Sequence, residues 1–180
     1  MDRRIERTRR AVVDATVDLV SRRGSHVGMT EIAQAAGVSR KAVYENFGSR
    51  DQVLLQTTVN LLRAELSLKS ATTHGEGDIL ERLAHTVADH MIGYKDYYAA
   101  VLSGPGGYLA GNALVVQLAA ACRQLRSEQH QPSASNLQER FMIHGLLGVL
   151  TEALVEHDSA DLHAVVTRLY HEMVASHRHS

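Results

Sequence analysis

The sequence contains little of what several classes of protein depend on. Its one cysteine, Cys122, excludes an internal disulfide framework and a structural zinc site built from cysteines. It has two prolines, Pro105 and Pro132, and no alternating apolar run of the kind that indicates strands. The richest apolar stretch, 109–122, is interrupted by polar residues and is too short to cross a bilayer. We therefore expect a helical protein that does not span a membrane.

The beginning of the chain also lacks the apolar segment of a secretory signal, since Met1 is followed by Asp2, Arg3 and Arg4. Of the 180 residues, 44% are apolar and 22% are charged, which is ordinary globular usage. This length suits one compact core, or a small head on a larger body. These features predict a cytoplasmic protein with no membrane partner.

Net charge is close to zero, at -1, but the charges are not evenly spread. Residues 1–50 contain ten basic and six acidic side chains, whereas residues 51–180 contain nine basic and fourteen acidic ones. The first segment therefore carries +4 and the second -5. A basic head favours a polyanion such as nucleic acid as its partner, although an accidental gradient on a mixed surface would give the same totals.

Apolar residues recur with the helical period along the whole chain. The first expected helix ends near Gly24, and short helices follow, closed by Gly37 and capped by Ser39. Further helices are expected to begin after Ser49 and after Asp78. Others are expected at 95–102, 108–126 and 137–156, and a last helix has an apolar stripe over 162–173. The fold class is therefore all-α, with about nine helices.

The most informative segment is 29–51, M-T-E-I-A-Q-A-A-G-V-S-R-K-A-V-Y-E-N-F-G-S-R-D. It predicts two short helices joined by a tight turn at Gly37, with the small residue Ala33 where the helices approach each other. Ile32, Val38 and Val43 would pack between them. This is the pattern of a helix-turn-helix, whose second helix can enter a DNA major groove.

The same residues resemble a known family. The pattern Ile32-Ala33-x-x-Ala36-Gly37-Val38-Ser39, followed by Val43-Tyr44-x-x-Phe47-x-Ser49-Arg50, is similar to the N-terminal signature of the TetR/AcrR transcriptional regulators. The resemblance implies a three-helix DNA-binding head at 1–48 and a ligand-binding and dimerisation body at 49–180. It also implies a homodimeric repressor that binds a palindromic operator and is released by a small-molecule effector, with no cofactor and no enzymatic activity.

Residues that would contact DNA follow from this resemblance. Arginine or lysine suits guanine, asparagine suits adenine, and alanine can contact the methyl group of thymine. Tyr44 would direct its hydroxyl to a phosphate, and Arg50 would bind a phosphate together with the N-terminus of the fourth helix. The full set is Thr30, Ser39, Arg40, Lys41, Ala42, Tyr44, Glu45, Asn46 and Arg50.

Gly28 is a departure from the family pattern, which commonly has threonine or serine here to cap the second helix and contact a phosphate. Glycine is an acceptable cap but offers no hydroxyl. The arginines Arg3, Arg4 and Arg7 would form either an arm that reaches the DNA or simply the solvated start of a helix.

The segment 137–156 is apolar on two faces, so it needs two packing partners, namely its own core and a second subunit. Together with the last helix of each chain it would form a four-helix bundle between subunits. The alternative is a fully buried helix of a monomer. The expected interface residues are Leu137, Phe141, Gly145, Gly148, Leu162, Val166, Leu169 and Met173.

An effector pocket is expected among the helices between residues 78 and 148, with apolar walls and a few polar groups. Each candidate residue by itself also fits an ordinary core or surface position. The candidates are His90, Met91, Tyr94, Tyr98, Tyr108, Asn112, Val116, Phe141 and His144.

Three other functions are weighed against this one. Eleven histidines raise the possibility of a metal-responsive regulator on the same fold, but no His-x-x-x-His pair or Cys/His cluster gives ligand spacing. A small helical enzyme would need a nucleophile with an oriented base, and 104–107 lacks the lysine of a phosphate loop. A regulator that acts through a protein partner is disfavoured by the positive recognition helix.

Overall fold

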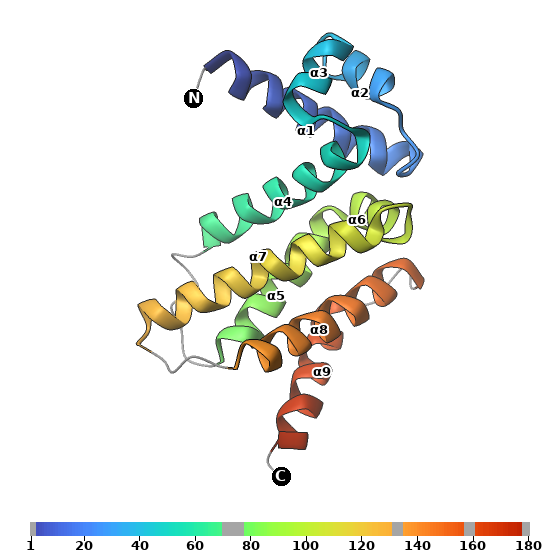
Figure 1. The fold of residues 1–180 in the computed structure, drawn as a ribbon. Coiled ribbons are helices and arrows are strands. Elements are labelled where there is room, and N and C mark those ends of the chain that lie inside the picture. The colour runs from blue at the N-terminus through green and yellow to red at the C-terminus, as the bar shows by residue number, and fades with distance from the viewer. Residues whose placement is uncertain (1–2, 70–77, 131–134, 157–160, 178–180) are drawn as a thin grey trace. The chain divides into compact units, whose positions relative to one another are not determined.

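The structure is a computed structural model that describes residues 3–69, 78–130, 135–156 and 161–177. This part of the chain forms helices and short connections, and contains no strand. The predicted all-α fold is confirmed for it (Figure 1). The helices are α1 (Arg3–Arg23), α2 (Met29–Ala35), α3 (Arg40–Phe47), α4 (Arg50–Lys69), α5 (Ile79–Gly93), α6 (Lys95–Ser103), α7 (Gly107–Glu128), α8 (Asn136–Glu156) and α9 (Leu162–His177).

Three helices begin at the side-chain caps that the sequence indicates. The Ser39 hydroxyl accepts a hydrogen bond from the Ala42 N–H (3.1 Å) at the start of α3. At α4 the Ser49 hydroxyl accepts from a backbone N–H of the first turn, and at α5 the Asp78 carboxylate does the same (3.2 and 2.7 Å). Each cap satisfies a backbone donor that the helix itself leaves without a partner.

The chain divides into two compact units. Unit 1 contains the residues up to Leu61 together with Tyr94–Ala113, and unit 2 contains Leu62–Gly93 together with the residues from Leu114 onward. Helices α4 and α7 each contribute residues to both units. Unit 1 is therefore larger than the head predicted at 1–48, because it also includes α6 and parts of α4 and α7; the functional boundary after residue 48 stays a prediction.

In unit 1, α1 contacts α2, α3 and α6. Figure 1 shows α1, α2 and α3, coloured blue to cyan, grouped together. Val12 and Val20 of α1 are fully buried, as are Ile32 of α2 and Val43 of α3. Helix α1 has 21 residues, which gives it the length to contact α6 as well as α2 and α3.

The connection before α7 packs closely on the connection before α2. A Cβ atom added at Gly104 would lie 2.0 Å from the Ser25 hydroxyl and 2.7 Å from the Ala100 carbonyl oxygen. Only glycine fits such a close approach. Ser25 is buried here, so the 103–107 loop is part of the packing of unit 1.

Unit 1 also contains a buried tyrosine that joins α6 to α4. The Tyr97 hydroxyl donates to the Leu54 carbonyl oxygen (3.2 Å) and lies 3.0 Å from the Thr58 hydroxyl. Burial raises the pKa of Tyr97 well above its usual range, so the hydroxyl stays protonated and available as a donor. The aromatic ring and the hydrogen bond together hold α6 on α4.

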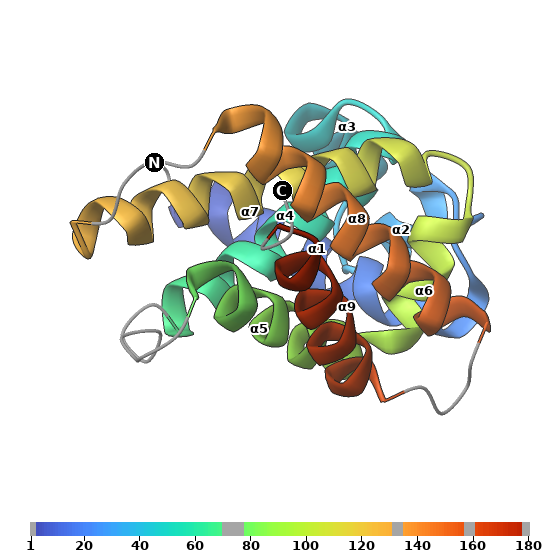
Figure 2. The ribbon, with the colours of Figure 1, turned by 90° about the horizontal axis from the view of Figure 1, so that it is seen from below.

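In unit 2, α9 contacts both α5 and α8, as Figure 2 shows from below. Leu162 and Val166 of α9 are buried in this contact, and Leu169 is half-buried. The apolar stripe of α9, predicted to meet a second subunit, therefore faces the core of its own unit. The side chain of Met173 lies outside the described residues.

Within the described ranges, no single helix has both the length and the apolar composition that a membrane span needs. Helices α6 and α7 reach that composition only as a pair, and the pair is bent by 119°.

Replacing Tyr97 with phenylalanine removes the hydroxyl and keeps the ring, so we expect the free energy of unfolding to fall by about 1 kcal/mol. The same change at Tyr108, which is 82% exposed, serves as the control and should have almost no effect. Urea unfolding followed by circular dichroism measures both. Equal stability losses in the two variants would contradict the assigned role of the Tyr97 hydroxyl.

Candidate functional site

Helices α2 and α3 form a helix-turn-helix. At the turn, Gly37 adopts a φ of +65°, a conformation that favours glycine. The Val38 N–H donates to the Ala33 carbonyl oxygen (3.0 Å), which closes the turn. Ile32 and Val43 are fully buried on facing sides of the turn. The packing therefore fixes the direction of α3 relative to α2.

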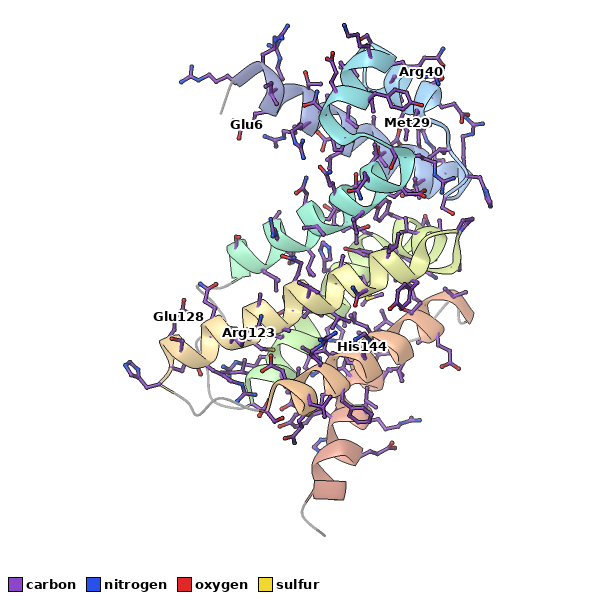
Figure 3. The ribbon with its side chains drawn as sticks, viewed as in Figure 1. Glu6, Met29, Arg40, Arg123, Glu128 and His144 are labelled. Atoms are coloured by element: carbon purple, nitrogen blue, oxygen red, sulfur yellow. The ribbon has the colours of Figure 1, made fainter. Side chains whose placement is uncertain are left out.

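The first two turns of α3 present a polar and cationic face. Arg40, Lys41, Tyr44 and Glu45 are exposed, and Figure 3 shows Arg40 at the start of the helix. Of the other predicted DNA contacts, Thr30 and Ser39 are exposed, while Ala42, Asn46 and Arg50 are half-buried. Six of the nine predicted residues are thus exposed to solvent. All nine lie on α2, on α3, at the N-cap of α3 or at the start of α4.

Arg40 and Tyr44 act as a pair. The Arg40 Nη2 donates to the Tyr44 hydroxyl oxygen (3.2 Å), and the guanidinium lies over the tyrosine ring, 5.3 Å from its centre. Because the tyrosine oxygen accepts this bond, its own hydrogen is left for another acceptor. A phosphate oxygen near the pair would receive a hydrogen bond and a positive charge together.

Lys41 and Asn46, which are also candidates for base contacts, already have partners within the free head. The Lys41 ammonium lies 3.7 Å from the Glu45 carboxylate, and both side chains are exposed. The Asn46 amide donates to the Ala42 carbonyl oxygen of its own helix (2.8 Å). Asn46 must give up this bond before its amide can pair with an adenine.

Arg9 contacts the end of α3, and the sequence analysis did not single it out. Its Nη1 donates to the Asn46 carbonyl oxygen (2.7 Å), its Nη2 donates to Gln56, and the guanidinium lies over the Phe47 ring. A cation at the carbonyl end of α3 is favoured by the helix dipole. The signal was present, because Arg9 shares a helix face with the buried residues Val12 and Val13.

At the start of α4 the predicted phosphate site is partly occupied. The Arg50 guanidinium lies 3.2 Å from the Asp51 carboxylate, and its side chain is mostly covered. The Ser49 hydroxyl already accepts one backbone N–H of the first turn. A phosphate here would meet the remaining backbone donors and would have to compete with Asp51 for the arginine.

At the start of α2 a carboxylate binds the backbone N–H of Gly28, which has no hydroxyl of its own. Glu31 reaches back to accept a hydrogen bond from the Gly28 N–H (2.8 Å), and Arg23 pairs with the same carboxylate (2.6 Å). The Gly28 N–H and then the Arg23 charge hold the pKa of Glu31 below its usual range. This is half of a capping box, made without a serine or threonine.

The predicted effector residues do not form one lining. Met91, His90 and Tyr98 are buried, whereas Tyr108 and Phe141 are mostly exposed. His144, labelled on α8 in Figure 3, is exposed as well. Tyr94 and Val116 are exposed and Asn112 is half-buried. The predicted set therefore mixes buried and exposed residues. A helical stripe in the sequence does not show which side of the helices has a cavity.

Unit 2 instead contains an open cleft of about 320 Å³ between α4, α5 and α7, which we call the α4–α5–α7 cleft. None of the nine predicted effector residues lines it. The lining residues are Arg63, Leu66, Ser67, Leu83, Thr86, Gln117, Ala120, Ala121, Gln124 and Leu125. Ligand sites commonly have volumes of ~300–1,000 Å³, so the cleft is large enough for a small molecule.

Helix α8 has two faces of opposite exposure. Ile143 and Leu150 are fully buried in unit 2. On the other face, Leu137 is 81% and Phe141 74% exposed, and the exposed glycines Gly145 and Gly148 continue this face along the helix. Large exposed apolar side chains next to small residues are typical of a surface that another protein covers. We call this the outer face of α8.

Groups that a metal would need are not assembled in the described parts of the chain. No set of three or more histidine, cysteine, aspartate or glutamate side chains there is arranged to hold a metal ion. Burial raises the pKa of the Cys122 thiol to about 12, so it stays protonated and unreactive.

Comparison with known proteins gives three findings. Residues 12–57 match the family model of the bacterial regulatory proteins of the tetR family. The HTH-type transcriptional regulator BetI of Agrobacterium fabrum is 45% identical over 56 residues, which are 31% of this chain and 27% of that protein. The chain therefore matches about a quarter of the length of this relative.

Solved structures resemble the chain over most of its length. A tetR-family transcriptional regulator from Streptomyces coelicolor is similar with a TM-score of 0.64 at 21% identity, over 94% of this chain and 80% of its own. FadR of Thermus thermophilus, a repressor in complex with lauroyl-CoA, gives 0.61 at 21% identity, over 92% and 93%. At these identities the similarity establishes the fold.

Replacing Glu31 with glutamine tests the cap of α2. Because folding lowers the pKa of Glu31, its charge stabilises the folded state fully above the ordinary value of 4.5, and this contribution is lost as pH falls through the lowered value. We therefore expect a lower Tm for E31Q than for the wild type at pH 7, and a difference that shrinks toward pH 3.

The matched control is E45Q, which alters an exposed carboxylate of α3 that accepts no backbone N–H in the structure. Its Tm should follow the wild type at every pH. A gap between E31Q and the wild type that stays constant from pH 7 to pH 3 would rule out the charge of Glu31 as its cause. Thermal melts followed by circular dichroism give both comparisons.

Proposed function

We propose that this chain, which belongs to the tetR family of bacterial regulatory proteins, is a DNA-binding transcriptional repressor that a small-molecule effector releases from its operator. The observation that carries the proposal is the helix-turn-helix of α2 and α3 with the exposed cationic face of α3. The family model covers this part of the chain, and the relative BetI is an HTH-type transcriptional regulator.

The head alone supplies too few base contacts for a useful specificity. We propose that two heads act together on a palindromic operator with half-sites about 34–36 Å apart, as a two-fold dimer requires. The excess of basic residues in 1–50 supports this end as the one that meets DNA, and the acidic remainder disfavours unspecific contact.

Different residues of the head would perform different tasks. The Arg40–Tyr44 pair suits a phosphate, because the two side chains already converge and offer a charge and a free hydroxyl hydrogen. Lys41 and Asn46 suit base edges once they leave Glu45 and the Ala42 carbonyl oxygen. Arg9 would act as a positioning residue, since it holds the far end of α3.

The outer face of α8 is the proposed dimer interface. Its apolar residues are Leu137 and Phe141, and Gly145 and Gly148 permit close approach of a second helix. On α9, Leu162 and Val166 are buried in the chain's own core, which favours the exposed residues of α8 as the main contact surface. We therefore propose an interface that depends more on α8 than on α9.

The α4–α5–α7 cleft is the proposed effector site. The related FadR of Thermus thermophilus is a repressor in complex with lauroyl-CoA, which supports a ligand-responsive mechanism here. The effector would favour the state of the protein with the lower affinity for the operator, and only a difference in its own affinity for the two states can produce that shift. Helix α4 is suited to transmit it, because it lines the cleft and begins directly after the head.

The function is tested by selecting bound sites from random DNA and measuring affinities for the selected operator. We expect Tyr44→Ala and Arg50→Ala to weaken binding to all sequences, and Arg50→Ala, which removes a charge, to lower the salt dependence by about one counterion as well. Changes at Lys41 or Asn46 should alter the preferred base instead, at a cost of ~1–3 kcal/mol. Arg168→Ala, on α9, is the control. Wild-type affinity in all four head variants would refute the assignment.

Replacing Phe141 with glutamate places a charge in the proposed dimer interface and should convert the dimer to a monomer. Size-exclusion chromatography with light scattering measures the molar mass, and circular dichroism checks that the helices remain. Ile92→Glu is the control, because Ile92 is also an exposed apolar residue but lies on α5. A dimer that survives F141E, or one that is lost equally in I92E, would exclude the outer face of α8 as the interface.

A further inference from the structure

The α4–α5–α7 cleft has an apolar side and a polar side. Leu83 and Leu125 are buried and Leu66 is half-buried, so they provide the apolar side. Arg63 and Gln117 are on the polar side, from α4 and α7. A molecule that binds here therefore meets hydrocarbon in one direction and hydrogen-bonding groups in the other, which suits an amphipathic ligand.

Among the described residues of this lining, Arg63 is the one charged side chain and none is acidic. Its Nε donates to the Gln117 amide oxygen (2.7 Å), and no other hydrogen bond or ion pair joins it to a described residue. A guanidinium has five N–H hydrogens, so both terminal nitrogens keep donors for a ligand. Gln117 thus orients the guanidinium without neutralising its charge.

The lining also argues against other classes of ligand. A cation would meet the charge of Arg63, and the lining residues that the structure describes include neither an aromatic ring nor a carboxylate to hold it. A phosphate dianion would find only the single charge of Arg63, so one of its two negative charges would have no partner in the described lining. A neutral molecule would remove water from Arg63 and leave the charge without a counter-charge, which is costly.

We propose that the effector is a small amphipathic monocarboxylate. Its carboxylate binds the terminal nitrogens of Arg63 in the two-pronged geometry that guanidinium favours, and its hydrocarbon part lies on Leu66, Leu83 and Leu125. The inference rests on the proposed function only in naming this molecule the effector; the binding itself is independent of DNA. The volume of about 320 Å³ is close to the lower limit of ligand sites, so the acid is short.

Arg63 also connects the ligand to α4. The Arg63–Gln117 bond joins α4 to α7 across 54 residues of sequence, so a carboxylate that draws the guanidinium toward itself acts on the contact between these two helices. Ligand binding at Arg63 would therefore act on α4, the helix that follows the head in the chain.

The test uses the full chain with octanoate and phenylacetate as carboxylate probes, octanamide as the neutral isostere and octanoyl-coenzyme A as the bulky ester. Isothermal titration and thermal shift measure binding. We expect both carboxylates to bind and to raise Tm, and octanamide to bind at least ~10-fold more weakly, because a charge-assisted hydrogen bond is lost. Equal binding of octanamide, or binding of the coenzyme A ester alone, would overturn the proposal.

Three variants locate the site. Arg63→Met keeps the stem and removes the charge, so it should weaken octanoate binding by ~10- to 100-fold. Gln117→Ala, which removes the orienting acceptor, should weaken it less. Arg168→Met changes an arginine outside the cleft and should bind octanoate like the wild type. Unchanged octanoate affinity in R63M, with wild-type helix content by circular dichroism, would overturn the proposal.

The same preparations are tested for binding to the selected operator, which separates the two proposals. If the wild type binds operator DNA but no carboxylate, the ligand class is wrong and the proposed function stands. If carboxylates bind through Arg63 but no DNA is bound, the ligand class stands and the proposed function is wrong. If both bind and octanoate lowers operator affinity in the wild type but not in R63M, both are supported.

Discussion

The packing of α3 against α2 across the turn at Gly37 is the constraint on which the functional surface depends. Ile32 and Val43 are buried completely at this contact, and the turn requires a positive φ at its centre. Arg9 of α1 holds the other end of α3 through the Asn46 carbonyl oxygen. With both ends fixed, the exposed face of α3 has one direction, as a helix that presents side chains to a DNA groove requires.

The polar side chains on that face already interact with one another or with their own helix in the free protein. Arg40 is bonded to Tyr44, Lys41 is near Glu45, and the Asn46 amide is turned onto its own helix. Exposed pairs of this kind contribute ~0–1 kcal/mol, so DNA can replace them at little cost. They keep long side chains close to the helix until a partner arrives, and this limits the entropy that binding must remove.

Much of the fold could be predicted from local patterns. Helix starts followed from Ser39, Ser49 and Asp78, because a cap and the backbone donor that it satisfies lie within three residues. The two-faced character of α8 also followed from its apolar pattern. The apolar pattern did not show that Leu162 and Val166 are buried within their own unit, and their part in a dimer interface stays a prediction. An apolar stripe shows that a face is covered, but it does not show whether the cover is the same chain or a second one.

The sequence by itself determined that the chain is helical, that residues 29–51 form a helix-turn-helix and that the basic charge is concentrated around it, because each of these depends on neighbours along the chain. Only the tertiary structure decided which faces pair and where a hollow remains. The α4–α5–α7 cleft exists because residues from three helices meet, and Arg63 reaches Gln117 from 54 positions away. Contacts over such distances depend on how whole helices pack, and a periodic pattern contains no information about that.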